Sequence, residues 1–196
     1  WNRPGGEHGG YIPTIWGVSG LPVETSVWRY VEKIDGSILI IKYLGSDVDV
    51  VIPSILDGKS VSELYEKCFS DKSSITSVTI PNSITNIGEL AFSGCSSIEK
   101  IYIPTSVTTI YASSTSYSPF YGWDSSAIIY CGVSSESNWG AYWNYYNDTS
   151  RLTTICNVAG FPQQNSDWIY VTKNDGTIGI LKYLGPAVEV TIPSIL

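Results

Sequence analysis

Apolar and polar residues alternate on both sides of a short turn in the first quarter of the chain. In residues 27–45 (VWRYVEKIDGSILIIKYLG), Tyr30 lies in the segment before the turn and Ile38 begins the segment after it. Alternation with a period of two is typical of β-strands. The dipeptide Asp35-Gly36 between them supplies the positive φ that a tight hairpin turn needs. The pattern predicts an antiparallel β-hairpin.

The same pattern returns 140 residues later. Residues 14–56 align with residues 154–196 without a gap, and 25 of the 43 aligned residues are identical. The turn returns as Asp175-Gly176, and both copies end in V-x-V-x-I-P-S-I-L. Internal repetition of this kind indicates a modular layout. The second copy is therefore expected to open a further array whose remaining coils lie outside the chain.

A shorter period of 23 residues lies between the two hairpins. Ile75–Ser97 (ITSVTIPNSITNIGELAFSGCSS) is followed by Ile98–Ile110 (IEKIYIPTSVTTI), with apolar residues and a proline at equivalent places. A strand of about four residues ends at each proline, because proline cannot donate a ladder hydrogen bond. A short turn in each coil is expected to carry Phe69, Phe92 or Phe120 inward. Since one coil cannot bury its apolar face alone, the repeat predicts a solenoid with a short parallel sheet.

This short repeat resembles the BspA-like leucine-rich repeat family of bacterial and protist surface proteins. The family motif, roughly I-x-x-I-x-I-P-x-S-V-x-x-I-G-x-x-A-F-x-x-C-x-x-L, matches Ile75–Ile98 almost position for position. The resemblance extends from Val48 to about Cys131, with Ile and Val replacing most leucines and an insertion at Tyr111–Ser118. It implies a leucine-rich repeat solenoid with a non-catalytic, adhesive role at a bacterial surface.

The repeats divide the chain into four segments. Residues 1–13 are expected to form a leader or linker, and residues 14–47 an N-terminal β-hairpin unit. Residues 48–150 would hold the leucine-rich repeat array with a capping helix. Residues 151–196 would hold the second hairpin unit and the first strand of a following array. The predicted fold class is mainly β with short helices, a leucine-rich repeat solenoid flanked by β-hairpin units.

An aromatic-rich segment follows the array. Trp139, Tyr142, Trp143 and Tyr146 are spaced i, i+3, i+4, i+7, which predicts one face of a helix that covers the last coil. The alternative is that aromatic rings stay exposed and stack on a glycan. The residues considered for glycan binding are Trp123, Trp139, Trp143 and Tyr145.

Strand alternation assigns the residues of the array to two faces of its parallel sheet. Apolar residues such as Val78 and Ile80 point inward. Because a solenoid leaves the other face open, that face is the expected partner-binding surface. The alternative is that it carries ordinary strand-forming residues with no partner. The residues assigned to partner binding are Asp49, Val51, Thr79, Lys100, Tyr102, Ile128 and Tyr130.

Composition and charge disfavour several other function classes. The formal net charge of −7, from 11 Lys and Arg against 18 Asp and Glu, disfavours binding to nucleic acid or an anionic membrane. No apolar run is long enough to span a bilayer. The single histidine, His8, lies in a Gly-rich leader without a nucleophile beside it. Neither enzymatic activity nor a cofactor or metal site is expected.

The four cysteines, Cys68, Cys95, Cys131 and Cys156, lack the spacing of a metal site. Buried free thiols are the favoured interpretation, since cysteine behaves as a small apolar residue in cores. One disulfide in a secreted protein is the alternative.

The sequence therefore predicts a secreted or cell-surface bacterial module that adheres to a host or environmental protein or glycan. A structural spacer in a stalk of tandem modules is the first alternative, and carbohydrate binding through aromatic rings is the second. The last strand, Val188–Ile192, cannot bury its apolar face alone. The unit Trp168–Ile192 is therefore expected to pack on Trp139–Tyr146 or to self-associate with another molecule.

Overall fold

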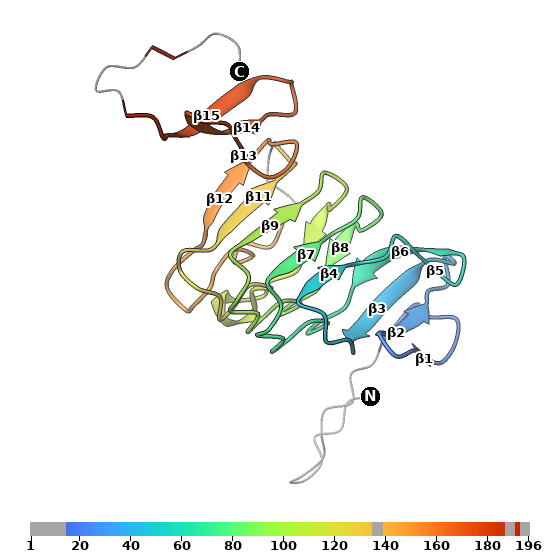
Figure 1. Ribbon diagram of the computed structural model, residues 1–196. Coiled ribbons are helices and arrows are strands. Elements are labelled where there is room, and N and C mark those ends of the chain that lie inside the picture. Colours follow the sequence, from blue (N-terminus) through green and yellow to red (C-terminus); the bar gives the residue numbers. More distant parts are fainter. Residues whose placement is uncertain (1–14, 135–138, 187–190, 193–196) are drawn as a thin grey trace.

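The computed structural model describes residues 15–134, 139–186 and 191–192. These residues form two sheets of short strands, wound into a solenoid, and a separate three-stranded sheet at its C-terminal end (Figure 1). Their only helical element is a 3₁₀ turn, η1 (Thr115–Tyr117). The leucine-rich repeat solenoid predicted from the 23-residue period is confirmed, whereas the predicted short α-helices are not found in the described residues.

The first sheet combines the strands of the N-terminal hairpin with one short strand from each of three coils. Its strand order is β1-β2-β3-β6-β8-β10, with β5 beside β6. Strands β2 and β3 pair antiparallel around Gly36, whose φ is +82°, so the predicted hairpin is present. Strand β3 then pairs in parallel with β6, which attaches the hairpin to the first coil. The bounds are β1 (Val23–Glu24), β2 (Trp28–Glu32), β3 (Ile38–Tyr43), β5 (Ile55–Leu56), β6 (Lys59–Leu64), β8 (Asn86–Ile87) and β10 (Thr109–Ile110).

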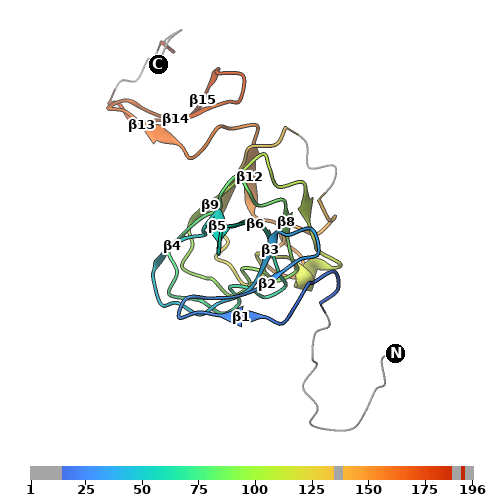
Figure 2. The ribbon, with the colours of Figure 1, turned by 90° about the vertical axis from the view of Figure 1, so that its right-hand side faces the viewer.

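The second sheet is parallel and has the order β12-β11-β9-β7-β4. Viewed roughly along the solenoid axis, the sheets that contain β4 and β3 lie on opposite sides of the coils (Figure 2). Strands β4, β7 and β9 each stop at or just before the isoleucine that precedes a proline. The bounds are β4 (Asp49–Val51), β7 (Ser77–Thr79), β9 (Lys100–Ile103), β11 (Ile128–Cys131) and β12 (Thr153–Cys156).

A column of aromatic rings runs through the core between the two sheets. Tyr43 stacks on Phe69 with ring centroids 5.3 Å apart, Phe69 on Phe92 at 5.1 Å, and Phe92 on Phe120 at 6.1 Å. All four rings are buried. The three phenylalanines come from the turns predicted to carry them inward, and Tyr43 comes from the hairpin. The hairpin and the coils therefore share one core.

The helix predicted over Trp139–Tyr146 is wrong, because these residues form turns. The Gly140 amide donates to the Ile110 carbonyl at 2.8 Å. A Cβ atom at Gly140 would lie 2.9 Å from the Ala112 nitrogen. The backbone thus lies directly against the preceding coil, which leaves no room for the side chains of a helix. Trp139 and Trp143 are nevertheless buried in the main core and cover the last coil.

One disulfide joins Cys131 and Cys156, which occupy directly opposed positions on β11 and β12 with their Cα atoms 4.4 Å apart. The expectation of free thiols is therefore wrong for this pair, because parallel strand pairing brings the two residues together. It is confirmed for Cys68 and Cys95, which are free and buried. Burial raises the pKa of the Cys68 thiol strongly and that of Cys95 to about 12, so both stay protonated at neutral pH.

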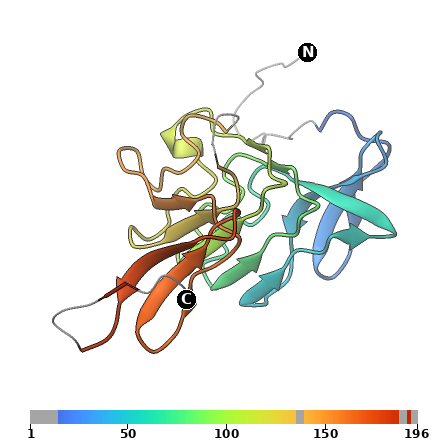
Figure 3. The same cartoon turned by 90° about the horizontal axis from the view of Figure 1, so that it is seen from above.

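The third sheet is the second hairpin, with β13 (Gln163–Gln164), β14 (Trp168–Thr172) and β15 (Ile178–Tyr183) in that order. It projects from the end of the array (Figures 1 and 3). Its unit packs against the outer face of the parallel sheet, through the cluster of Tyr130, Val158 and Val171, rather than on Trp139–Tyr146. Most of the expected strand Val188–Ile192 lies outside the described residues.

Candidate partner-binding surface

The outer face of the parallel sheet is open over β4 and β7. Asp49 pairs with Ser77 and Val51 with Thr79 in the sheet register, so their side chains form two adjacent rows. All four residues are exposed, and the Val51 side chain is 70% exposed. The Asp49 carboxylate accepts hydrogen bonds from the Thr76 hydroxyl at 3.0 Å and the Ser77 hydroxyl at 2.8 Å. These bonds fix the carboxylate beside an exposed valine.

The same face is covered over β9 and β11 by residues of the second hairpin unit. The Phe161 ring meets Tyr102 edge-on at 6.2 Å and Tyr130 at 5.9 Å between centroids. The Tyr102 hydroxyl donates to the Val158 carbonyl at 3.3 Å. Burial raises the pKa of both tyrosines above the ordinary value. The cluster consists of Tyr102, Ile128, Tyr130, Ile155, Val158 and Val171.

Only part of the predicted surface is therefore open to a partner. Tyr130 is 4% exposed, so its assignment as an exposed binding residue is wrong. Tyr102 and Ile128 are half-buried beneath the second hairpin unit. The physical reason is that this unit folds back onto the sheet, which the alternation of residues within each strand cannot reveal.

Lys100 lies at the boundary between the covered and open parts of the face. Its side chain is exposed, and its ammonium nitrogen is 5.3 Å from the centroid of the Phe161 ring. We use the term open face for the exposed residues of β4, β7 and β9 on this side of the parallel sheet. The open face consists of Asp49, Val51, Ser77, Thr79 and Lys100.

The tryptophans considered for glycan binding are buried, so that assignment is wrong for all three. The Trp123 indole donates to the Phe92 carbonyl at 2.8 Å, and the Trp139 indole donates to the Val107 carbonyl at 3.2 Å. Trp123, Trp139 and Trp143 belong to the main core, so their rings cannot stack on a sugar. The fourth candidate, Tyr145, is half-buried, with the Arg151 guanidinium 4.8 Å from its ring centroid.

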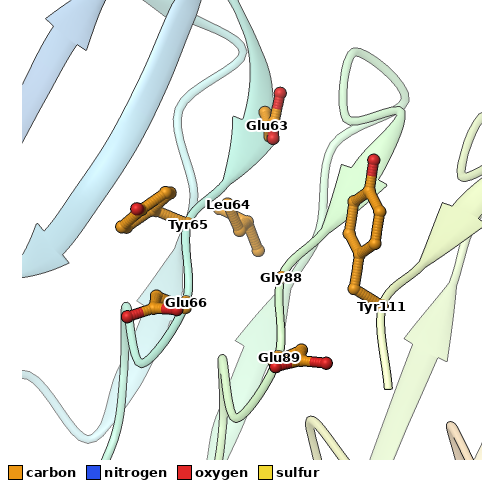
Figure 4. A pocket seen from close by; sticks show the side chains of 7 residues that line it. All are labelled: Glu63, Leu64, Tyr65, Glu66, Gly88, Glu89 and Tyr111. Carbon is orange, nitrogen blue, oxygen red and sulfur yellow. The ribbon is translucent and has the colours of Figure 1, made fainter. Parts of the chain in front are cut away.

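A groove that the repeat pattern did not indicate lies at the ends of β6, β8 and β10 (Figure 4). Tyr65, Gly88 and Tyr111 occupy equivalent positions in three successive coils, 23 residues apart. In Figure 4, Gly88 lies between Tyr65 and Tyr111, and the Tyr65 ring points away from Gly88. The groove has a volume of about 230 Å³. Its lining consists of Glu63, Leu64, Tyr65, Glu66, Gly88, Glu89 and Tyr111.

The groove is acidic, but two of its three carboxylates already have partners. Glu63 forms an ion pair with Lys33 at 3.3 Å, and Glu89 accepts a hydrogen bond from the Ser113 amide at 2.7 Å. The 23-residue register applied beyond the phenylalanines would have placed Tyr65 and Tyr111 on either side of Gly88. Among the described residues there is no group of three or more His, Cys, Asp or Glu able to hold a metal ion. The described part of the chain also has no helix long and apolar enough to cross a membrane.

The stacked coils and their parallel sheet define a leucine-rich repeat solenoid. The family model for the BspA type leucine rich repeat region matches residues 51–121, with six copies of the repeat. Residues 51–121 therefore match a BspA-type leucine-rich repeat region, as the motifs of this segment indicated. No curated protein matches the chain.

Three solved structures of bacterial proteins resemble the chain. A leucine-rich repeat protein from T. pallidum is 23% identical over 69% of this chain, with a TM-score of 0.38. One from Bacteroides capillosus is 20% identical over 56% of this chain and 97% of its own, with a TM-score of 0.42. A leucine-rich cell surface protein from Faecalibacterium prausnitzii is 14% identical over 84% of this chain and 62% of its own, with a TM-score of 0.34. The chain spans 64% of the T. pallidum protein.

Proposed function

We propose that the chain is a non-catalytic binding module that holds a protein or glycan partner at a bacterial surface through the open face. The observation that carries this proposal is the exposure of Val51 between polar neighbours. Asp49 lies two residues before it, and Thr79 lies opposite it in the register. An apolar centre with a polar rim is the usual anatomy of a protein interface. Adhesion is then the function of a rigid sheet that presents this small surface.

The disulfide between Cys131 and Cys156 supports a location outside the cytoplasm. Disulfides persist in oxidising compartments and are rare in the reducing cytosol. A secreted or surface-attached module satisfies this condition.

The test is a binding screen followed by two matched substitutions. The whole chain is applied to immobilised extracellular-matrix proteins and to a glycan array, and each hit is measured by surface plasmon resonance. Val51→Glu places a carboxylate in the apolar centre of the open face, where we expect binding to weaken about ten-fold or more. Tyr111→Ser in the groove is the control and should leave the affinity unchanged. Loss of binding with Tyr111→Ser alone would move the site to the groove.

A structural spacer remains the second candidate function, and the covered half of the sheet favours it. Phe161 and Val158 occupy surface that a leucine-rich repeat protein could otherwise offer to a partner. Their contacts with the sheet would fix one module to the next, as a stalk of tandem modules requires. Failure of the whole chain to bind any probe in the screen would favour this spacer over the adhesive module.

A further inference from the structure

The first hairpin unit exposes large apolar side chains that nothing in the described structure covers. Trp16 is 86% exposed, Leu21 is 89% exposed and Ile34 is 76% exposed. The Ile34 amide donates to the Gly17 carbonyl at 2.8 Å, which places Ile34 beside the segment that carries Trp16. We call these three residues the N-terminal face. Exposed apolar residues gathered on one unit mark an interaction surface more often than isolated ones do.

The second hairpin unit carries the same backbone framework 140 residues later. Val18 forms a bridge with Lys33, and Val158 forms the same bridge with Lys173. The Ser19 amide donates to the Glu32 carbonyl at 2.9 Å, as Ala159 does to Thr172 at 2.8 Å. Equivalent positions in the two units can therefore be compared directly.

In the second unit, each position of the N-terminal face touches the last coil of the array. Cys156 is equivalent to Trp16 and is disulfide-bonded to Cys131. Phe161 is equivalent to Leu21, and its ring packs on two tyrosines of β9 and β11. Asn174 is equivalent to Ile34, and its side-chain amide donates to the Gly132 carbonyl. The second unit thus shows what kind of surface covers these three positions.

We propose that the N-terminal face is a docking surface for the last coil of another BspA-type leucine-rich repeat array. In this joint, Trp16 lies opposite the position equivalent to Cys131, and Leu21 covers the outer face of the last two strands as Phe161 does. This joint differs from the contact between the second hairpin unit and the last coil, because Trp16 stands where Cys156 forms the disulfide. It is therefore held by apolar burial and strand pairing, without a covalent link.

A second copy of this chain is not the expected partner. The edge of β11 in each copy is already paired with its own β12, residue by residue from Ile128 to Cys131. The matching face is likewise covered by Phe161 of the same copy. The partner must offer a last coil whose strand edge and outer face are both free. This inference goes beyond the binding function proposed above, because it concerns the N-terminal face and not the open face.

Disulfide trapping in a tandem chain tests the geometry of this joint. The tandem chain is made by joining residues 14–153 directly to a second copy of residues 14–196. The N-terminal face of the second, internal copy then follows a complete array. Trp16→Cys in the internal unit should form a disulfide with Cys131 of the first array, read by non-reducing peptide mass spectrometry. Leu21→Cys at the same joint is the matched control and should form no disulfide with Cys131, because the equivalent Phe161 packs on Tyr102 and Tyr130.

The same Trp16→Cys substitution in the 196-residue chain should also keep a reactive thiol, because Cys131 is already bonded to Cys156 there. If the internal Trp16→Cys thiol in the tandem chain reacts as fast as it does in the 196-residue chain, the proposed docking is wrong.

A second variant keeps the test independent of disulfide formation. Leu21→Ser in the internal unit should lower the folding equilibrium constant of the tandem chain about ten-fold, because Leu21 is buried only in the joint. Urea unfolding measures this change. The 196-residue chain should not change, since Leu21 is exposed there. Equal urea midpoints for the tandem chain with and without Leu21→Ser would contradict the proposal. A dimer of the 196-residue chain that Leu21→Ser abolishes would also contradict it, by showing a second copy as the partner.

Discussion

The two hairpin units have closely related sequences but different surroundings. Comparing them shows which features come from the sequence of the unit and which come from its neighbours. In the first unit, β3 pairs with β6 of the array, and its Ile38 and Ile40 side chains are 1% and 0% exposed. In the second unit, the equivalent Ile178 and Ile180 on β15 are half-buried, and β14 is the only strand paired with β15 in the described residues. Both units form the turn, with φ of +82° at Gly36 and at Gly176. The sequence of the unit therefore specifies the hairpin, whereas the array that follows it supplies the burial.

The largest expected effect comes from removing the ring that joins the first unit to the coils. Phe69 is fully buried and touches Trp28 and Tyr43 of the hairpin and Phe92 of the next coil. Phe69→Ala should lower the free energy of unfolding by about 3–5 kcal/mol, since it opens a cavity in the shared core. Hydrogen exchange should accelerate in β3 and leave β15 unchanged. Equal acceleration in both strands would show that the two units share one cooperative core.

The next effect concerns the second unit, which a disulfide attaches to the array. Replacing Cys131 and Cys156 together by serine should lower stability by about 3 kcal/mol, through the chain entropy of the loop that the bond closes. Amides of β14 and β15 should lose protection from exchange before those of β3 do. Cys95→Ser is the single-site comparison, because this thiol is free and lies in the coils. An unchanged β14–β15 exchange rate in the double variant would contradict the role of the bond in docking.

The fold could be predicted from sequence wherever a residue's position followed from a short period. The inward row of the parallel sheet, for example Val78, Ile101 and Ile129, is buried as the alternation required. The helix over Trp139–Tyr146 could not be excluded, because helical spacing of aromatic residues also fits a turn that is held by close backbone contact at Gly140. Periodicity reports which residues are apolar, not how near another backbone lies.

The candidate surface was predicted only in part, for a different physical reason. The residues assigned to the outer face do share one face of the sheet, as the pairing of Tyr102 with Tyr130 shows. Their burial depends on Phe161, which belongs to a segment outside those strands. Long-range contacts of this kind leave no periodic signal in the sequence.

A smaller effect is expected from a matched pair of substitutions at one equivalent position. Phe161→Ser uncovers Tyr102 and Tyr130 and should destabilise the second unit by about 1–2 kcal/mol, since the ring is only partly buried. Leu21→Ser in the first unit should change stability by less than about 0.5 kcal/mol, because surface positions without contacts are tolerant. Urea unfolding of both variants measures the difference. A destabilisation by Leu21→Ser as large as that by Phe161→Ser would show that Leu21 is already docked within the 196-residue chain.

The smallest effect should be a loss of docking in alkali that depends on the tyrosines beneath Phe161. Burial beneath the second unit raises the pKa of Tyr130 above the ordinary value for tyrosine. The neutral phenol therefore favours docking fully at pH values below the ordinary tyrosine pKa, and this contribution falls as pH rises through the raised pKa of the docked state. Tyr130→Phe keeps the packing and removes the ionisable hydroxyl, so exchange protection of β14 should persist to higher pH in this variant. The measurement is the pH at which β14 loses protection from exchange, recorded beside the ultraviolet titration of tyrosinate. Identical loss of protection in the unmodified chain and in Tyr130→Phe would assign the alkaline effect to other groups.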